Sequence, residues 1–249
     1  MLFPRRRRFA NGPSTEPGER IYVVGDVHGR LDLLTEIVDR IGDHAGRLPP
    51  ARAIHVVLLG DLVDRGPDSA GVLDHVHSLQ RRHDAFVVLK GNHEDMMIRA
   101  LAGERGVLSA WLGGGGAETL ASYGIPLPAE PYDEEAVAVA LRAAVPRPIR
   151  HWLAGLPLTA RSGDYFFCHA GVRPGVPLKR QSAQDLLWIR REFLSDDSDH
   201  GAVVVHGHSI ASDVEWRDNR IGIDTGAYRT GRLTALYLEG TEREIIATG

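Results

Sequence analysis

Short apolar runs alternate with amphipathic stretches in the first hundred residues of the chain. The runs IYVV, IHVVLL and FVVL begin at residues 21, 54 and 86, and they are rich in the β-branched and aliphatic residues that favour strands. Residues 31–44 and 70–82, which lie between these runs, carry apolar residues at helical spacing. This alternation predicts a βαβαβ core with right-handed helical crossovers.

The pattern changes after residue 94. Residues 95–160 are mainly helical in character and are interrupted by GGGG and by several prolines, so we expect a helical cap insertion. Strand-like runs return near residues 165, 202, 221, 233 and 244, mostly too close together for intervening helices, which predicts a second, more antiparallel sheet. The expected fold class is α/β, with two packed mixed β-sheets flanked by helices and a helical cap.

The first residues differ from the rest of the chain. The segment MLFPRRRRF, with Arg5 to Arg8, is basic, but NGPSTEPGE follows in place of the apolar core that a secretory signal needs. We interpret residues 1–19 as a flexible basic tail, although contacts of these arginines with anionic lipid, RNA or an acidic partner stay open. Residues 20–249 are expected to form one domain, as is usual for α/β enzymes of this length.

Composition narrows the function classes only loosely. The 249 residues are 43% hydrophobic, enough for a sizeable core, and the formal net charge of −4 gives no reason to expect a stable nucleic-acid partner. No segment approaches the ~18 uninterrupted apolar residues of a membrane span. The one cysteine, Cys168, has no partner for an intrachain disulfide, which is compatible with a reducing, cytoplasmic location.

Five polar motifs follow apolar runs, where a strand meets its loop and where open α/β sheets hold their active sites. They read GDVHG, GDLVDRG, GNHE, HAG and HGH, and their candidate metal ligands are Asp26, His28, Asp61, Asn92, His169 and His208. Carboxylate, amide and imidazole donors suit Mn, Fe or Zn better than copper. Six donors are too many for one tetrahedral ion, but with Asp61 as a bridge they suit two metals about 3.5–4 Å apart. Such a pair activates water and clamps phosphate oxygens in phosphoester hydrolysis.

The order of these motifs resembles that of the calcineurin-like metallophosphoesterases of the phosphoprotein phosphatase type. Their signature reads GDxHG, GDxVDRG and GNHE, followed by two later histidines, and the resemblance covers roughly residues 20–240. The short bacterial and phage members are most similar, and they include serine/threonine protein phosphatases and symmetrical diadenosine tetraphosphate hydrolases. The resemblance therefore implies two packed sheets around a dimetal centre.

The resemblance also implies roles for the matching residues. The two metals would be held by Asp26 and His28 on one side, by Asn92, His169 and His208 on the other, and by Asp61 between them. His93 would be the general acid that protonates the leaving oxygen, and Asp64 its orienting carboxylate. Arg65 and Asn92 would contact the phosphate. A further phosphate arginine follows a tryptophan in a WxR pattern, which favours Arg190 over its neighbour Arg191.

Three points stay open at this stage. The last histidine motif reads GHSI where relatives commonly have GHTP, and strand alternation places His206 and His208 on one face, so only the resemblance favours His208. The run Gly113 to Gly116 lacks the GK[ST] of a P-loop, so we favour a flexible turn over a phosphate nest or a close approach to substrate. Four aromatic residues of the cap are expected in the core, although they could stack on a nucleobase: Trp111, Tyr123, Tyr132 and Trp152.

The leading hypothesis for function is a protein serine/threonine phosphatase that uses two divalent metals, with manganese favoured over iron or zinc. The alternative is a symmetrical bis(5'-nucleosyl)-tetraphosphatase or a related nucleotide pyrophosphohydrolase. The expected partners are accordingly a phosphoprotein, a small phosphoester or a dinucleotide. A scaffold without activity would be expected to lack a ligand or the acid, yet Asp61, Asn92 and His93 are all present.

Overall fold

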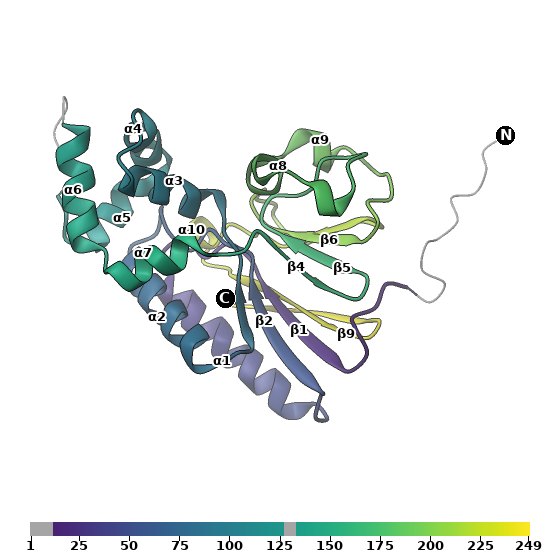
Figure 1. Ribbon diagram of the computed structural model, residues 1–249. Coiled ribbons are helices and arrows are strands. Elements are labelled where there is room, and N and C mark those ends of the chain that lie inside the picture. The colour runs from purple at the N-terminus through teal and green to yellow at the C-terminus, as the bar shows by residue number, and fades with distance from the viewer. Residues whose placement is uncertain (1–11, 127–132) are drawn as a thin grey trace.

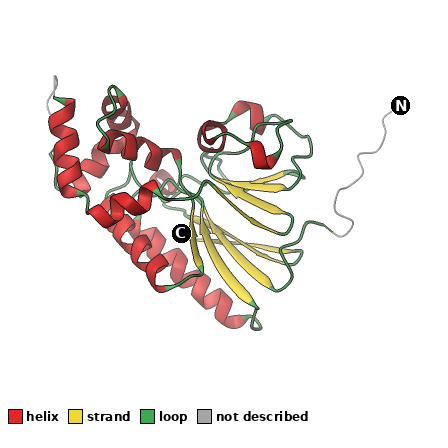
Figure 2. Ribbon diagram, in the orientation of Figure 1, coloured by secondary structure: helices red, strands yellow, loops and turns green. Residues whose placement is uncertain are grey.

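The computed structural model describes residues 12–126 and 133–249, which form two β-sheets packed face to face and flanked by helices (Figures 1 and 2). The first sheet has the order β10-β9-β1-β2-β3 and the second the order β4-β5-β6-β8-β7. The strands of the first sheet are β1 (Glu19–Val24), β2 (Ala53–Leu58), β3 (Phe86–Val88), β9 (Thr234–Glu239) and β10 (Glu242–Ala247). The expected architecture of two mixed sheets between helices is confirmed.

The predicted βαβαβ core is present. Strands β1, β2 and β3 are parallel, and they are connected by α1 (Leu31–Arg47) and α2 (Ser69–Arg82), which cover the outer face of this sheet (Figure 1). Alternation along β1 explains the layering: Tyr22 and Val24 belong to the core shared with the helices, whereas Ile21 and Val23 belong to the core between the sheets. Both faces of this strand are therefore buried, which its continuous apolar run indicates.

The second sheet differs from the prediction. Its strands are β4 (Thr159–Ser162), β5 (Tyr165–Cys168), β6 (Val203–His206), β7 (Glu215–Trp216) and β8 (Arg220–Gly222). The central pairs β5/β6 and β6/β8 are parallel, and only the outer pairs are antiparallel. The short helices η2 (Leu178–Arg180), α8 (Ala183–Trp188) and α9 (Arg191–Leu194) lie in the connection from β5 to β6, and in Figure 1 α8 and α9 cover the outer side of this sheet.

The last two strands also correct the prediction. We expected all late strands in the second sheet, but β9 pairs antiparallel with β1, and β10 pairs with β9 at the edge of the first sheet. The short helix α10 (Ala227–Thr230) precedes them. An apolar run indicates that a strand is buried, but it does not specify which strand lies beside it.

The helical cap is present at one end of the two sheets (Figure 2). It consists of the part of α3 (Asn92–Leu101) that follows GNHE, then α4 (Val107–Trp111), a kinked glycine-rich connection (Leu112–Gly116), α5 (Ala117–Ser122), α6 (Glu134–Ala144) and α7 (Arg147–Ala154). The four glycines connect α4 to α5 through a kink, because Gly115 has a non-helical φ of 116°. Among the described residues, no helix is long and apolar enough to cross a membrane.

The N-terminal segment packs onto the fold earlier than expected. Arg5 to Arg8 lie outside the described residues, but the Ser14 amide donates to Asp164 at 3.0 Å and the Thr15 amide donates to the carbonyl of Gly240 at 3.1 Å. Thr15 is also buried. The packed part of the chain therefore begins before residue 20, where we had placed the domain boundary.

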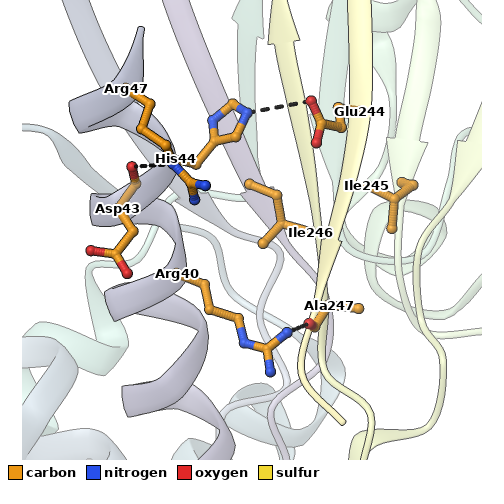
Figure 3. Close-up of a pocket in the computed structure, with 8 residues that line it drawn as sticks. All are labelled: Arg40, Asp43, His44, Arg47, Glu244, Ile245, Ile246 and Ala247. Carbon is orange, nitrogen blue, oxygen red and sulfur yellow. Dashed lines mark hydrogen bonds and ion pairs between the residues drawn. The ribbon is translucent and has the colours of Figure 1, made fainter.

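A surface depression lies between α1 and β10 (Figure 3). Its lining includes Arg40, His44 and Glu244, but none of the predicted site residues. The Arg40 guanidinium donates to the carbonyl of Ala247, and His44 lies 3.4 Å from the carboxylate of Glu244. These polar groups are therefore partnered within the protein.

Candidate dimetal active site

The six candidate metal ligands converge from loops at one end of both sheets. Asp26 and His28 follow β1, Asp61 follows β2, and Asn92 begins α3 just after β3. From the second sheet come His169, directly after β5, and His208, two residues after β6. All six side chains are buried. The structure thus brings together residues that are up to 182 positions apart in the chain.

Asp61 lies at the centre of the cluster. Its Oδ2 atom is 3.6 Å from Nε2 of His28 on one side and 3.4 Å from Nε2 of His169 on the other. The same His169 nitrogen lies 2.8 Å from Oδ1 of Asn92 and 3.2 Å from Nδ1 of His208. Asp61 therefore belongs to both groups of side chains that are close enough to share a metal ion, one with His28 and His93 and the other with His169 and His208.

Hydrogen bonds fix which nitrogen of each ring faces the cluster. Nδ1 of His28 lies 2.9 Å from the carbonyl of Val63, and Nδ1 of His169 lies 3.0 Å from the carbonyl of Leu59. Because a carbonyl only accepts, each Nδ1 carries the proton and each Nε2 presents a lone pair. Burial lowers the pKa of His28 to about 3 and that of His208 to about 2, so both rings are in the neutral form that binds metals.

The arrangement fits metal cations. The lone pair of His169 Nε2 faces the acceptor Oδ1 of Asn92 at 2.8 Å, a contact that is repulsive unless a cation lies beside it. Burial, followed by the charges of Asp224 and Asp61, raises the pKa of Asp26 well above its ordinary value. A buried cluster of facing acceptors and carboxylates is what two divalent ions would neutralise.

Unusual backbone conformations are concentrated at this site. Within residues 12–126 and 133–249, the non-glycine residues with positive φ are His28, Asp61, Asp64, Arg65 and His208. Each such conformation costs on the order of 1–3 kcal/mol and persists only where the surroundings enforce it. All five belong to the predicted site.

Glu94, the last residue of GNHE, enforces part of this geometry and was missed by the sequence analysis. Its buried carboxylate accepts hydrogen bonds from the backbone amides of Asp61 at 2.8 Å, Leu62 at 2.7 Å and Gly91 at 2.8 Å. Burial, followed by the charge of Asp61, raises the pKa of Glu94 to about 7. The residue ties the Asp61 loop to the start of α3, and its place within a motif was the available signal.

The structure distinguishes the two histidines of HGH. His206 ends β6, and its ring packs on Phe193 with centroids 5.0 Å apart. His208 lies beyond the strand with φ of 62°, and its ring faces His169. Strand alternation fails here because the strand has ended, and geometry joins the resemblance in favouring His208.

Next to the metal ligands, His93 and Asp64 form a buried pair. Nδ1 of His93 lies 2.6 Å from Oδ2 of Asp64, and Nε2 of His93 lies 3.9 Å from Oδ2 of Asp61. Burial lowers the pKa of His93, but the carboxylates of Asp61 and Asp64 outweigh burial and raise it above its ordinary value. The pair can hold a proton at the edge of the metal cluster.

Two arginines approach the same region. The guanidinium of Arg65 lies 2.8 Å from Nε2 of His28 and 3.0 Å from Nε2 of His93, and it rests 5.1 Å from the ring centroid of Tyr228. Arg190 is exposed, but after burial its charge contributes to the lowered pKa of both His169 and His208. Arg190 therefore lies within electrostatic reach of the second group of ligands.

The cap aromatics lie in or against the core where they are described. Trp111 is fully buried, and Tyr123 and Trp152 pack against the core, with the Trp152 indole donating to Gln80 at 2.6 Å. Tyr132 lies outside the described residues. The aromatic rings that border the metal cluster are others: Tyr228 stands 5.3 Å from the ring of His28, and Trp188 stands 6.4 Å from that of His208.

The two-sheet sandwich and its cluster of carboxylate, amide and imidazole donors define a metal-dependent phosphoester hydrolase. Residues 19–233 match the family model described as calcineurin-like phosphoesterase. The chain belongs to the calcineurin-like phosphoesterase family.

Individual relatives carry two kinds of name. The chain is 26% identical to the asymmetrical bis(5'-nucleosyl)-tetraphosphatase PrpE of Anoxybacillus flavithermus, over 86% of this chain and 88% of that protein. It is 28% identical to serine/threonine-protein phosphatase 2 of Escherichia coli, over 86% of this chain and 90% of that protein. Among solved structures, a putative diadenosine tetraphosphatase matches with a TM-score of 0.64 at 21% identity, covering 95% of this chain and 97% of that one. This last likeness supports the fold alone.

Proposed function

We propose that this protein is a serine/threonine phosphoprotein phosphatase that uses two divalent metals, most favourably Mn²⁺. The convergence of buried donors on Asp61 carries the proposal, because Asp61 faces His28 on one side and His169 on the other. In our assignment, Asp26 and His28 would hold one metal, and Asp61 would contribute to both sites. The second metal would be held by Asn92, His169 and His208.

When bound, two such metals supply Lewis acidity and activate a water for in-line attack on phosphorus. The protein's own residues orient the substrate. Arg65 contacts His28, Asn92 contacts His169, and Arg190 lies within electrostatic reach of His208, so three hydrogen-bonding groups are available to hold phosphate oxygens. His93 then delivers its proton from Nε2 to the leaving oxygen, while Asp64 holds the ring through Nδ1.

The His93–Asp64 pair supports an alkyl phosphate as the substrate. A serine or threonine alkoxide is a poor leaving group and needs a proton as the P–O bond breaks. A nucleotide phosphate leaves as a stable anion and needs much less help. A buried histidine whose pKa two carboxylates raise is therefore most useful for phosphoserine and phosphothreonine.

Hydrolysis of dinucleoside tetraphosphates is the second candidate function. A relative's name supports it, and so do the two partly exposed aromatic rings beside the cluster, Tyr228 and Trp188, which offer surfaces for a nucleobase. The metals and the chemistry at phosphorus would be the same. The two candidates differ in what binds beyond the scissile phosphate.

The decisive experiment compares kcat/KM for a phosphoserine peptide and for diadenosine tetraphosphate with one metal-loaded preparation. We expect the peptide to be preferred by more than about tenfold, which corresponds to about 1.4 kcal/mol of transition-state binding. A preference of that size for the dinucleotide would overturn the proposal. Its products would then define the reaction, since two ADP molecules indicate symmetrical cleavage and ATP plus AMP asymmetrical cleavage.

A further inference from the structure

Asp64 is held by cap residues that lie outside the recognised motifs. Its carboxylate is fully buried, and both oxygens are engaged. Oδ2 accepts from His93 at 2.6 Å and from the indole Nε1 of Trp111 at 2.8 Å, while Oδ1 accepts from the hydroxyl of Thr119 at 2.6 Å. Trp111 and Thr119 are 47 and 55 positions away in the sequence. The cap thus supplies two of the three side chains that fix this carboxylate.

The two donors differ in their alternatives, because the Thr119 hydroxyl also lies 2.9 Å from Oγ of Ser69 whereas the Trp111 indole donates to Asp64 alone. Trp111 and Thr119 are fully buried, and an indole has a single polar group, so its hydrogen bond to Asp64 is the only one it can donate. Thr119 also accepts from the backbone amide of Asp64 at 3.0 Å, which ties the main chain to the same hydroxyl. A carboxylate held on both oxygens cannot rotate, so its lone pair stays directed at Nδ1 of His93.

Two glycines permit this approach. Gly115 has φ of 116°, its carbonyl accepts from the Arg65 amide at 3.0 Å, and a Cβ atom there would lie 2.6 Å from Cγ of Arg65. A Cβ atom at Gly116 would lie 2.5 Å from ring atoms of Trp111. At Gly113 a Cβ atom would meet nothing within 4 Å. Close packing therefore requires glycine at 115 and 116 but not at 113.

We propose that Trp111 and Thr119 are positioning residues that hold Asp64 and thereby orient His93 for proton donation to the leaving group. Gly115 and Gly116 allow the cap to come close enough for this. The inference rests on the acid role proposed for His93. It adds that the acid depends on the helical insertion, whereas the metal ligands depend on the sheets.

The test uses Trp111→Phe and Thr119→Val, which remove one hydrogen bond each and keep most of the bulk. Both enzymes are assayed with p-nitrophenyl phosphate, whose phenolate leaves easily, and with phenyl phosphate, whose phenolate needs more proton help. We expect kcat on phenyl phosphate to fall roughly 10-fold or more, a part of the ~10²–10⁴-fold contribution of a general acid. The fall on p-nitrophenyl phosphate should be several times smaller, with metal content unchanged. Thr119→Ser keeps the hydroxyl and should restore the rate.

The glycines provide a matched pair. Gly116→Ala forces the Trp111 ring to move and should show the same dependence on the leaving group, whereas Gly113→Ala should behave like the unaltered protein. A role in folding alone would lower the rates on both substrates by the same factor. If Trp111→Phe does not fold, Thr119→Val and the glycine pair decide the question.

His93→Ala, assayed in parallel, tests the acid role of His93 separately from the positioning role of Trp111 and Thr119. If His93→Ala loses equal rate on both esters, the acid assignment is wrong and the positioning inference is overturned with it. If His93→Ala depends on the leaving group but Trp111→Phe, Thr119→Val and Gly116→Ala do not, only the positioning inference is overturned. Both substrates are small aryl esters, so neither outcome depends on whether the natural substrate is a protein or a dinucleotide.

Discussion

The proposed metal ligands and the proposed acid pair lie side by side, but different parts of the molecule hold them. The metal ligands follow strand ends of both sheets, and backbone groups orient them, such as the carbonyls of Leu59 and Val63. The acid pair is oriented by side chains of the helical cap, Trp111 and Thr119. The first arrangement uses the rigid edge of the sheets, and the second uses tertiary contacts with an insertion.

This difference separates two functions that the short motifs combine. The loop GDLVDRG contains Asp61, which faces both metal sites, and three residues later Asp64, which faces the cap. If the proposed roles hold, a change in the cap should therefore alter proton delivery without disturbing the metals. A change in the sheet loops should affect every reaction the site performs.

Removal of the metals should have the largest effect, because it disables the part shared by all substrates. Treatment with a chelator is expected to abolish hydrolysis of p-nitrophenyl phosphate, and Mn²⁺ should restore it, since the metals contribute several kcal/mol or at least about 10³-fold in rate. Elemental analysis verifies the metal content. Full activity in a preparation shown to be free of metal would contradict the dimetal assignment.

Asp61→Asn should have the next largest effect, through weaker metal binding. The substitution removes one negative charge and one oxygen donor between the two sites, so both metals should bind more weakly and the rate should fall by about 10²-fold or more. Metal stoichiometry is measured together with kcat. Asp32→Asn, at an exposed aspartate paired with Arg30, is the control and should change neither quantity. Unchanged stoichiometry and rate in Asp61→Asn would argue against a bridge.

His93→Ala should affect proton donation to the leaving group and leave the metals in place. We expect kcat on a phosphoserine peptide to fall by roughly 10²–10⁴-fold with both metals retained, because the alkoxide loses its proton donor. The defect should be smaller on p-nitrophenyl phosphate, which leaves without much help. If the variant loses its metals, His93 supports metal binding, and the separation between the metal ligands and the acid pair does not hold for this residue.

Arg190→Ala should have a smaller effect that does not follow the leaving group. A guanidinium that holds phosphate oxygens acts in the ground state and in the transition state, so KM should rise and kcat should fall, together by about tenfold to a hundredfold in kcat/KM. Arg191→Ala is the matched control, because Arg191 is an equally exposed neighbour. A larger loss in Arg191→Ala than in Arg190→Ala would transfer the role to Arg191.

Many of the candidate metal ligands could be predicted because the sequence motifs that carry them are local. Apolar runs followed by GDVHG, GDLVDRG and GNHE specify strand, turn and ligand within a few residues, and parallel strands place their carboxyl ends at one edge. The βαβαβ core followed from the same pattern. The choice between His206 and His208 did not, because it depends on where β6 ends and on the positive φ of His208.

The sequence by itself determined the kinds of donor, their order along the chain and the strands that carry them. Only the tertiary structure decided that β9 and β10 complete the first sheet, that Glu94 ties the Asp61 loop to α3, and that the glycine run packs against Arg65 and Trp111. The physical reason is that periodicity reports whether a residue is buried, but not which distant residue it meets. The hydrogen bonds from Trp111 and Thr119 to Asp64 form only after the cap has packed against the sheets, so no local pattern contains them.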